Sequence, residues 1–239
     1  MSKTCLIIGA SGEIGSSTVL SLVKKGYSVG LQYHSNAKSI DKLNKNIPHA
    51  QRLGFFQADL STDEGIRSFI NMIDSDWDSV VFAGGHLWKG LFQDMEEADM
   101  DALYRVHVKA PWLITRHLLP SMIRNREGNI VVVSSLFGEE GASMEVAYSA
   151  VKGAQISFVK GLAKEVGPSG IRVNAVTPGL IATKMNEELS EEEFGAVEEE
   201  IPLSRAGRTE EVGDAIEFLL SDRSSYITGH ILKVNGGWS

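Results

Sequence analysis

A tyrosine and a lysine four residues apart, Tyr148 and Lys152, suggest acid–base chemistry. Side chains at this spacing lie one above the other on a single helix face. An ammonium group beside a phenol favours the phenolate, so the pKa of Tyr148 is expected to fall below its free value of about 10. Tyr148 would then act as a proton donor and acceptor near neutral pH.

A serine thirteen residues before the tyrosine indicates which reaction Tyr148 and Lys152 could catalyse. Ser135 follows Ser134 at the end of a valine-rich run, and its hydroxyl can polarise the carbonyl oxygen that Tyr148 protonates. A Tyr-x-x-x-Lys spacing by itself is common by chance. Together with Ser135 and a glycine-rich segment near the N-terminus, it predicts hydride transfer to a carbonyl, with Ser135, Tyr148 and Lys152 as catalytic residues.

The glycine-rich segment lies between the first apolar run and the first helical pattern, at residues 9–15. Glycines permit a tight turn and a close approach of the backbone to a pyrophosphate, and the helix N-terminus that follows offers free N–H groups. A purely structural strand–helix junction is the other interpretation. The position in a strand–helix–strand unit favours a dinucleotide site, with the cofactor contacted by Gly9, Ser11, Gly12, Glu13, Ile14 and Gly15.

The end of the second predicted strand indicates which dinucleotide binds. An acidic side chain there accepts hydrogen bonds from the ribose of NAD and repels a 2′-phosphate. The sequence instead reads His34-Ser35-Asn36, without a carboxylate, so NADPH is favoured over NADH. Because no arginine lies there, His34, Ser35 and Asn36, with Lys38, are expected to hold the phosphate.

An acidic residue follows the third predicted strand, in Ala58-Asp59-Leu60-Ser61. Asp59, together with Leu60, could contact the adenine of the cofactor. The carboxylate could also cap the turn that leads into the next helix, and the sequence leaves both interpretations open.

Apolar runs bounded by turn residues alternate with helical patterns along the whole chain. Strands are predicted at residues 6–8, 29–33, 53–58, 80–82, 130–133, 173–176 and 231–234. Helical patterns lie at residues 14–25, 63–73, 97–124, 147–166 and 209–221. Continuous Val, Ile and Leu runs indicate strands covered on both faces, as in a parallel sheet. The alternation predicts a single, doubly wound Rossmann-type α/β domain over residues 1–239.

The composition excludes several classes of function. Lys and Arg total 23 against 31 Asp and Glu, a formal charge of −8, whereas nucleic-acid binders usually carry a basic footprint. No apolar run reaches the ~20 residues that span a bilayer. Cys5 is the only cysteine, so an internal disulfide cannot form, and the histidines show no paired metal-ligand spacing. We expect a cytoplasmic protein without a nucleic-acid, membrane or metal partner.

A glutamate-rich segment, residues 182–205, differs in composition from the rest of the chain. It follows a strand end, where ligands bind in sheets of this kind, so it is interpreted as a substrate lid. A solvated helical face is the other interpretation.

In combination these motifs resemble the short-chain dehydrogenase/reductase family over essentially the whole chain. The resemblance rests on residues 9–15, 59–60, 135, 148–152, 171–179, 183 and 235–237. It implies seven parallel strands in the order 3-2-1-4-5-6-7, Tyr148 as acid and base, Lys152 on the nicotinamide ribose, and Ser135 on the substrate carbonyl. It also implies a homotetramer, and a nicotinamide half contacted by Pro178, Gly179, Ile181 and Thr183.

Three positions depart from the family pattern. Glu13 replaces the second glycine, and a carboxylate there is unfavourable for a pyrophosphate unless it turns away. After the fourth strand the usual Asn-Asn-Ala-Gly reads Phe82-Ala83-Gly84-Gly85, with Ala83 and Gly84 expected along the cofactor. His107 replaces the family's fourth catalytic residue, an asparagine. It could still relay a proton to Lys152, and a packing role is the other interpretation.

Within the family, the chain resembles the 3-oxoacyl-[acyl-carrier-protein] reductases and, more narrowly, the bacterial elongation factor P 5-aminopentanone reductases. The narrower resemblance rests on residues 118–125, 138–146, 152–155, 157–164 and 234–238, and on the context of His107. It implies reduction of a ketone on a modified lysine of elongation factor P.

Charge gives a second argument about the substrate. The lid glutamates, with Glu139, Glu140 and Glu145, would repel an acidic acyl carrier protein and attract a cationic aminopentanone. Arg124 and Arg126 instead form a basic spot that could dock an acidic carrier. Two alternatives stay open: a 3-oxoacyl-[acyl-carrier-protein] reductase of fatty-acid synthesis, and an NADP-binding regulator that no longer catalyses.

Overall fold

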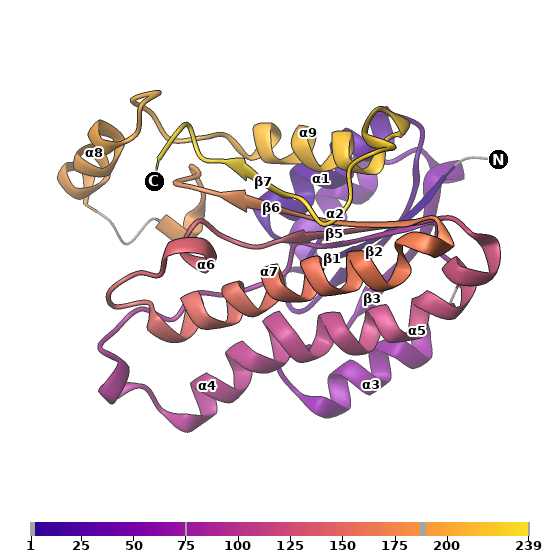
Figure 1. Cartoon of the computed structure of the whole chain (residues 1–239), viewed down its shortest axis with the longest axis horizontal. Helices are drawn as coiled ribbons and strands as arrows, with labels where there is room; N and C mark the ends of the chain where they lie inside the picture. Colours follow the sequence, from indigo (N-terminus) through magenta and orange to yellow (C-terminus); the bar gives the residue numbers. More distant parts are fainter. Residues whose placement is uncertain (1–2, 75, 187–189, 239) are drawn as a thin grey trace.

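The computed structural model describes residues 3–74, 76–186 and 190–238, and it contains a seven-stranded sheet in which all neighbouring strands are parallel. The strands lie in the order β3-β2-β1-β4-β5-β6-β7 (Figure 1). Their bounds are β1 Thr4–Ile8, β2 Ser28–Tyr33, β3 Arg52–Gln57, β4 Ser79–Phe82, β5 Gly128–Val133, β6 Ile171–Pro178 and β7 Ile231–Val234. The predicted parallel sheet and its strand order are confirmed.

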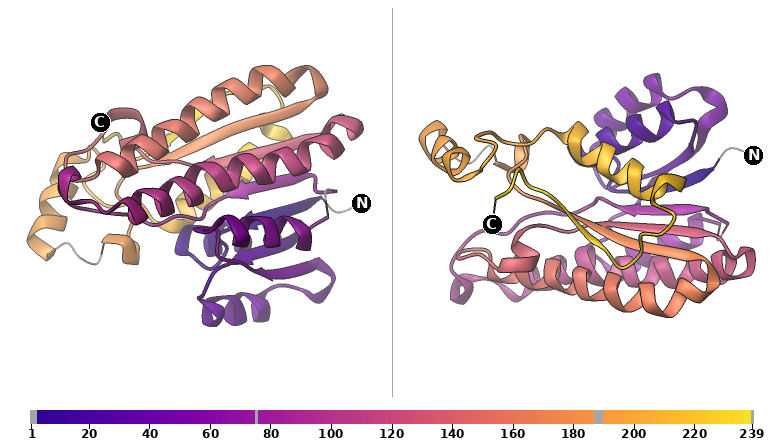
Figure 2. Two further views of the ribbon diagram at one scale, coloured as in Figure 1. Left: turned by 90° about the horizontal axis from the view of Figure 1, so that it is seen from below. Right: turned by 45° about the horizontal axis from the view of Figure 1, so that its top comes forward.

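Helices cover both faces of this sheet, as Figures 1 and 2 show. One face carries α1 Glu13–Lys24, α2 Ala37–Asn46 and α9 Thr209–Leu220. The other face carries α3 Asp63–Met72, α4 Glu97–Tyr104, α5 Ala110–Asn125 and α7 Val146–Val166. Two shorter helices, α6 Phe137–Glu140 and α8 Glu191–Glu200, lie toward the carboxyl ends of the strands. The arrangement is the predicted doubly wound Rossmann-type fold.

Each face of the sheet packs its own hydrophobic core. Successive side chains of a strand point to opposite faces. In β1, Leu6 and Ile8 therefore join the core beneath α3, α5 and α7, whereas Cys5 and Ile7 join the core beneath α1, α2 and α9. A sheet that is covered on both sides requires apolar residues at successive positions, which is why the strands read as continuous apolar runs.

The parallel topology gathers the predicted site residues at one edge of the sheet. The strands are parallel, so their carboxyl ends all lie at this edge, and the predicted motifs lie on the segments that follow them, up to residues 235–237 after β7. Helix α7 runs back along the sheet from the same edge, and its first two turns carry Tyr148 and Lys152.

Two helical segments differ from the prediction. The pattern does not predict α2, because only Ile40 and Leu43 of this helix are buried, and Asn36 caps it by accepting a hydrogen bond from the Ser39 N–H. The helix predicted at 97–124 is interrupted by a π-helical turn at Arg105–Lys109. Hydrophobic periodicity does not reveal such a turn, because one wider turn shifts the apolar pattern by only one residue.

The glutamate-rich segment forms a short turn at Lys184–Asn186 and then α8, which projects beyond the carboxyl edge (Figure 1). Ser190 and Glu193 form a capping box at the start of α8. Glu187 and Glu188 of the predicted lid lie outside the described residues. In the described ranges, no helix is long and apolar enough to cross a membrane.

Candidate active site

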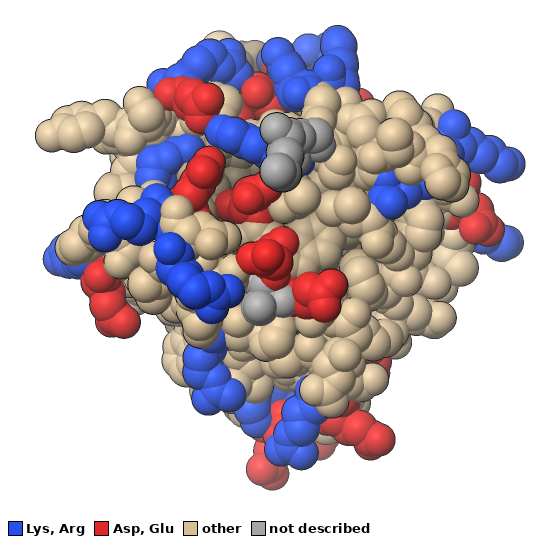
Figure 3. Space-filling model, turned by 90° about the vertical axis from the view of Figure 1, so that its right-hand side faces the viewer, with Lys and Arg blue, Asp and Glu red and all other residues tan. Residues whose placement is uncertain are grey.

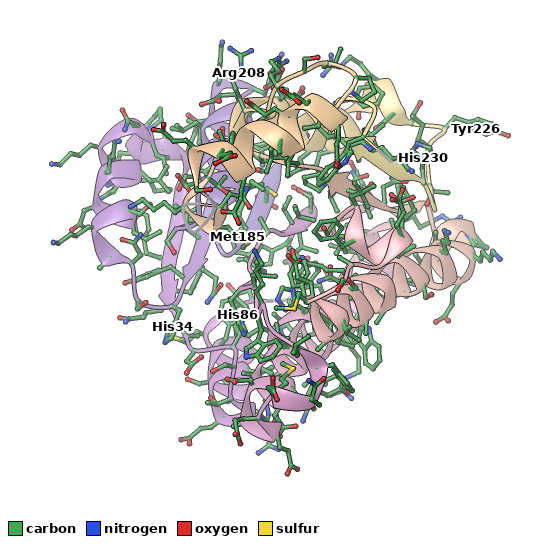
Figure 4. All side chains as sticks on the ribbon, turned by 90° about the vertical axis from the view of Figure 1, so that its left-hand side faces the viewer. His34, His86, Met185, Arg208, Tyr226 and His230 are labelled. Carbon is green, nitrogen blue, oxygen red and sulfur yellow. The ribbon has the colours of Figure 1, made fainter. Side chains whose placement is uncertain are left out.

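Two adjoining cavities open at the carboxyl edge of the sheet. The larger cavity, of about 570 Å³, lies between the glycine-rich turn and the ends of β2 and β3. The smaller cavity, of about 140 Å³, contains the predicted catalytic side chains and is called the catalytic cavity below. Both are lined by Ala83, Gly84 and Gly85, so the two linings are continuous. Figure 4 looks onto this end, where His34 and His86 line the larger cavity and Met185 lines the catalytic cavity.

The glycine-rich turn follows β1 directly and requires glycine at its first position. Gly9 has a φ of 80°, and a Cβ atom there would lie 2.2 Å from the Cα of Gly84. The buried side chain of Gln32 holds the turn from β2: its Oε1 accepts a hydrogen bond from the Gly9 N–H at 2.9 Å, and its Nε2 donates to the Ala58 carbonyl at 2.9 Å. The start of α1 is thereby fixed at the larger cavity, where a helix N-terminus favours an anion.

Glu13 turns its carboxylate away from this turn. Its Oε2 accepts a hydrogen bond from the backbone N–H of Lys184 at 2.7 Å, in the segment that follows β6. Glu13 is not part of the lining of either cavity. The side chain thus avoids the unfavourable approach to a pyrophosphate, and it joins α1 to the start of the predicted lid.

Gly15 and Ser35 also lie outside both linings. Gly15 packs α1 against the glycine-rich turn, since a Cβ there would lie 2.2 Å from the Gly9 carbonyl oxygen. Ser35 is exposed, and its carbonyl accepts a hydrogen bond from the Ala37 N–H.

The other predicted cofactor residues line one of the cavities. Those on the larger cavity are Gly9, Ser11, Gly12, His34, Asn36, Asp59, Leu60, Ala83 and Gly84. Those on the catalytic cavity are Ile14, Tyr148, Lys152, Pro178, Gly179, Ile181 and Thr183, again with Ala83 and Gly84.

The end of β2 places His34 beside a carboxylate. The Nε2 of His34 lies 3.8 Å from the Oδ2 of Asp59. Asp59 also accepts hydrogen bonds from the Ser61 hydroxyl at 2.7 Å and the Ser61 N–H at 2.9 Å, and these bonds, with the nearby His34, hold its pKa below the usual range. Asp59 therefore caps the turn before α3, and it also brings a negative charge to the predicted phosphate site, which the sequence analysis did not place there.

Helix α7 carries the predicted catalytic pair into the catalytic cavity beside β5. The Nζ of Lys152 lies 5.5 Å from the ring centroid of Tyr148 and donates to the Val133 carbonyl at 2.9 Å. The Ser134 hydroxyl donates to the Lys152 carbonyl at 2.9 Å, which fixes α7 against β5. Ser135 forms a side-chain hydrogen bond with Tyr148. The structure thus brings the three predicted catalytic side chains together.

Burial has a larger effect on the pKa values of Tyr148 and Lys152 than the charge of the lysine has. Tyr148 is 8% exposed and Lys152 is 4% exposed. Burial raises the pKa of Tyr148, against the lowering effect of its hydrogen bond with Ser135. Burial lowers the pKa of Lys152 to about 7. The expectation that Lys152 lowers the pKa of Tyr148 is wrong for this structure, because both charged forms lose their hydration in the cavity wall.

His107 is fully buried behind the tyrosine ring. The two rings are T-shaped, with centroids 5.7 Å apart. The Nε2 of His107 lies 3.0 Å from the His86 carbonyl oxygen, and its Nδ1 has no hydrogen-bond partner among the described residues. Burial and the charge of Lys152 hold the pKa of His107 well below its usual value, so the imidazole is neutral. No hydrogen bond joins His107 to Lys152 in the described part of the chain, and the relay stays a prediction.

The π-helical turn at Arg105–Lys109 shapes the surroundings of His107. Single turns of this kind are frequent at functional sites. The Nε2 of Gln155, on α7, donates to the His107 carbonyl at 2.8 Å. Gly85 leaves space for the imidazole, since a Cβ there would lie 2.3 Å from the Cε1 of His107. The turn, α7 and the segment after β4 together hold this side chain.

Several lining residues were not predicted for the site, among them Gln32, Glu145 and His86. Gln32 has a signal in the sequence, because a polar residue inside an apolar strand needs a polar partner. Glu145 was considered only as a charge near the site, and the sequence does not show that it lines the catalytic cavity. His86 lines the larger cavity through the irregular segment after β4, for which the sequence carries no pattern.

The larger cavity is suited to a dinucleotide. Gly9 and Gly84 let two backbone segments meet without side chains between them, and the N-terminus of α1 opens beside this contact. The cavity continues into the catalytic cavity, so the lining residues named above could hold a nicotinamide cofactor along its length. In residues 3–74, 76–186 and 190–238, no group of three or more His, Cys, Asp or Glu side chains is placed to hold a metal ion.

Comparison with known proteins identifies the family of the chain. A protein-family profile described as enoyl-(acyl carrier protein) reductase matches residues 9–239. The chain is 47% identical to the uncharacterized oxidoreductase YmfI of Bacillus subtilis (strain 168), covering 100% of this chain and 99% of the relative. It is 35% identical to the 3-oxoacyl-[acyl-carrier-protein] reductase FabG of Thermotoga maritima, covering 98% of this chain and 97% of the relative. A solved short chain dehydrogenase/reductase family protein has a TM-score of 0.89 at 28% identity, covering 98% of this chain and 96% of that one. The chain therefore belongs to the short-chain dehydrogenase/reductase family of oxidoreductases.

Proposed function

We propose that this protein reduces a ketone to an alcohol with NADPH. The observation that carries the proposal is the placement of Ser135, Tyr148 and Lys152 in a cavity that continues into one suited to a dinucleotide. A ketone held there meets the hydroxyl of Ser135 and the phenol of Tyr148, which together polarise its oxygen. A bound nicotinamide cofactor would supply the hydride.

Tyr148 is the proton donor in this proposal. Its raised pKa keeps the phenol protonated at neutral pH, so a proton is available for the alkoxide that develops on the carbonyl oxygen. Lys152, whose pKa of about 7 allows it to gain or lose a proton near neutrality, stabilises the phenolate that remains. His107 packs against the tyrosine ring, and its unpartnered Nδ1 is the atom that would accept a proton in a relay with Lys152.

The preference for NADPH rests on the end of β2, where His34, Ser35 and Asn36 provide no carboxylate. An imidazole N–H of His34 would donate a hydrogen bond to a 2′-phosphate. The carboxylate of Asp59 lies 3.8 Å from the Nε2 of His34. The same carboxylate would repel the phosphate, so the selectivity depends on His34 lying between the two anions.

We propose one domain over residues 1–239, with residues 182–205 as a lid, assembled as a homotetramer. An exposed aromatic patch supports assembly. At its centre is Trp112 on α5, which is 43% exposed. The ring centroid of Tyr104 on α4 lies 6.5 Å from that of Trp112, and the ring centroid of Phe158 on α7 lies 6.3 Å from it. Exposed apolar patches of this kind mark interaction sites.

The proposed substrate is the 5-aminopentanone group on a modified lysine of elongation factor P, which would place the enzyme in the cytoplasm. Glu145 supports this choice because it lines the catalytic cavity. The glutamates outside the cavity are weaker support for a cationic substrate than the sequence suggests. Glu139 and Glu140 lie 3.7 and 3.8 Å from Lys233, and Glu193 is engaged in the cap of α8.

The main alternative is reduction of a 3-oxoacyl group on acyl carrier protein, the activity named for the Thermotoga maritima relative. The basic spot at Arg124 and Arg126 does not favour it. These residues lie where α5 ends and β5 is about to begin, at the end of the molecule opposite the catalytic cavity (Figure 1). Figure 3 shows that end, where acidic and basic side chains are interspersed.

The test is NADPH consumption with two substrates side by side: elongation factor P that carries the aminopentanone, and a short 3-oxoacyl thioester. We expect selective turnover of the modified factor, and selective turnover of the thioester would instead assign the protein to fatty-acid synthesis. The Tyr148→Phe variant should retain cofactor binding while turnover falls by about 10²–10⁴-fold, the usual contribution of a positioned acid. Binding of NADPH without turnover of any ketone by the wild-type protein would indicate a regulator that does not catalyse.

A further inference from the structure

We propose that Glu145 selects ketones that carry a positive charge, by forming an ion pair with an ammonium group of the substrate inside the catalytic cavity. The inference rests on the proposed ketone reduction. It names the substrate class as cationic ketones, whatever molecule carries them, and it assigns their recognition to one side chain.

The position of Glu145 is the first observation. It lines the catalytic cavity together with Tyr148, which follows it by three residues. The same lining contains apolar side chains, among them Leu87, Phe137 and Met185, and polar ones, among them Ser135, Lys152 and Asn186. A partly buried carboxylate attracts a cation more strongly than the same group in water.

The backbone around Glu145 is held in place by several hydrogen bonds. The Gly90 N–H donates to the Met144 carbonyl at 2.8 Å, and the Ser149 N–H donates to the Glu145 carbonyl at 2.8 Å. Met144 has a φ of 66°, in the left-handed region that a residue with a Cβ rarely adopts. Strained residues of this kind cluster at ligand sites, where they fix the direction of a neighbouring group.

The carboxylate of Glu145 has no hydrogen-bond or salt-bridge partner in the part of the chain that the structure describes. Among the described residues, it accepts no hydrogen bond and has no cationic side chain within 4.0 Å, although it is half-buried. Burial raises the pKa of Glu145, and the charge of the exposed Lys89 opposes this effect. The half-buried carboxylate is therefore free to pair with a substrate ammonium, and partial burial strengthens that attraction.

Two neighbouring features restrict where the ammonium lies. Lys152 is cationic at low pH and donates to the Val133 carbonyl at 2.9 Å, so it repels a substrate cation from the tyrosine end of the cavity. Glu139 and Glu140 lie close to Lys233 and do not line the cavity. Of the described residues in this lining, Glu145 is the one with a carboxylate, and the cation is expected at its side.

The test compares two rigid ketones of nearly equal shape. 4-Acetylpiperidine carries a protonated secondary amine at neutral pH, and acetylcyclohexane has a methylene group in its place. Neither can cyclise. With NADPH, the wild-type protein should show a kcat/KM for 4-acetylpiperidine about tenfold above that for acetylcyclohexane, as expected for one partly desolvated charge pair.

Three variants test which side chain sets the ratio of kcat/KM for 4-acetylpiperidine to kcat/KM for acetylcyclohexane. Glu145→Gln keeps the shape of the side chain and removes its charge, so the ratio should fall to within about twofold of one. Glu140→Gln removes the same charge outside the cavity, and the ratio should stay near the wild-type value. Lys89→Gln removes the cation that competes for Glu145, so the ratio should rise.

The outcomes separate this inference from the proposed function. Turnover of both ketones with the same ratio in wild type and Glu145→Gln would overturn the role of Glu145 and leave ketone reduction standing. An equal loss of the ratio in Glu140→Gln would also overturn it, because the effect would then come from the overall charge. Turnover of neither ketone by the wild-type protein would count against ketone reduction itself.

Discussion

At the scale of single residues, the catalytic cavity holds two ionisable groups whose pKa values move for the same reason. Burial disfavours any charge, so it raises the pKa of Tyr148 and lowers that of Lys152. At neutral pH the phenol is protonated and the lysine is close to its own pKa. The pair is therefore suited to give a proton to a developing alkoxide and to become charged as it does so.

The lysine makes the stability of the protein depend on pH. Its pKa is 10.5 in an exposed chain and about 7 in the fold, so between these values the unfolded chain holds a proton that the folded chain has released. Stability therefore rises with pH through this window and is lost as pH falls towards 7. From pH 7 to 9, the free energy of unfolding of the wild type should increase by about 1–2 kcal/mol relative to that of Lys152→Met.

Denaturant titration at each pH, without cofactor, measures this difference. Cys5 and Tyr27, whose pKa values burial raises to about 12, titrate alike in both proteins and cancel. Parallel pH profiles of the two proteins would show that Lys152 is charged in the fold at neutral pH.

At the scale of secondary structure, the site depends on places where regular elements are interrupted or joined. The π-helical turn Arg105–Lys109 turns His107 toward the tyrosine ring, and the carbonyl of His107 is taken by Gln155 of α7. Glu13 connects α1 to the segment after β6. Both contacts join elements that are far apart in the sequence.

Removing the imidazole should affect turnover more than folding. We expect His107→Ala to remain folded, because the turn is also held through its backbone by Gln155, while kcat falls between about tenfold and 100-fold. This is the range expected when a proton donor is displaced by about 1 Å. His107→Asn, which restores the residue usual in the family, should retain more activity. Wild-type turnover in a folded His107→Ala variant would exclude His107 from the site.

The bond from Lys184 to Glu13 should control local order at the start of the lid. Hydrogen bonds to charged groups contribute about 1.5–3 kcal/mol, so Glu13→Ala should speed amide hydrogen exchange in residues 182–186 by about tenfold or more. Glu13→Gln keeps an acceptor and should exchange more slowly than Glu13→Ala. Equal exchange in all three proteins would mean that the bond does not hold this segment in solution.

At the scale of the whole molecule, the cavities and the aromatic patch lie on different surfaces. The carboxyl edge carries both cavities, while the α4, α5 and α7 face carries the aromatic patch around Trp112. The proposed assembly through the patch would therefore leave the cavities open to substrate.

A charged side chain introduced at Trp112, the centre of the aromatic patch, should dissociate the proposed tetramer. We expect the wild type to sediment as a tetramer of its 26.0 kDa chain and Trp112→Glu to sediment as a smaller species. Tyr226→Glu is the matched control, because Tyr226 is fully exposed and remote from the patch (Figure 4). A tetrameric Trp112→Glu protein, or a wild type that sediments as a monomer, would contradict the proposed interface.

The fold class, the strand order that the family resemblance implies, and the candidate trio of Ser135, Tyr148 and Lys152 could all be predicted from the sequence. These depend on local patterns: apolar runs, glycines at a turn, and a spacing of four on one helix. Even the positions of Asp59 and His34 follow from strand ends. Their contact at 3.8 Å does not, because it depends on the pairing of β2 with β3.

Only the tertiary structure decided which groups meet and in which state of charge. The orientation of Glu13 required the segment after β6, and the exposure of Glu145 to the cavity required the loop that Gly90 holds. The sign of the pKa shift at Tyr148 was predicted wrongly, because sequence spacing shows a neighbouring charge but not the depth of burial. Burial is a sum over contacts from the whole chain, and in this cavity it outweighs the single charge beside the ring.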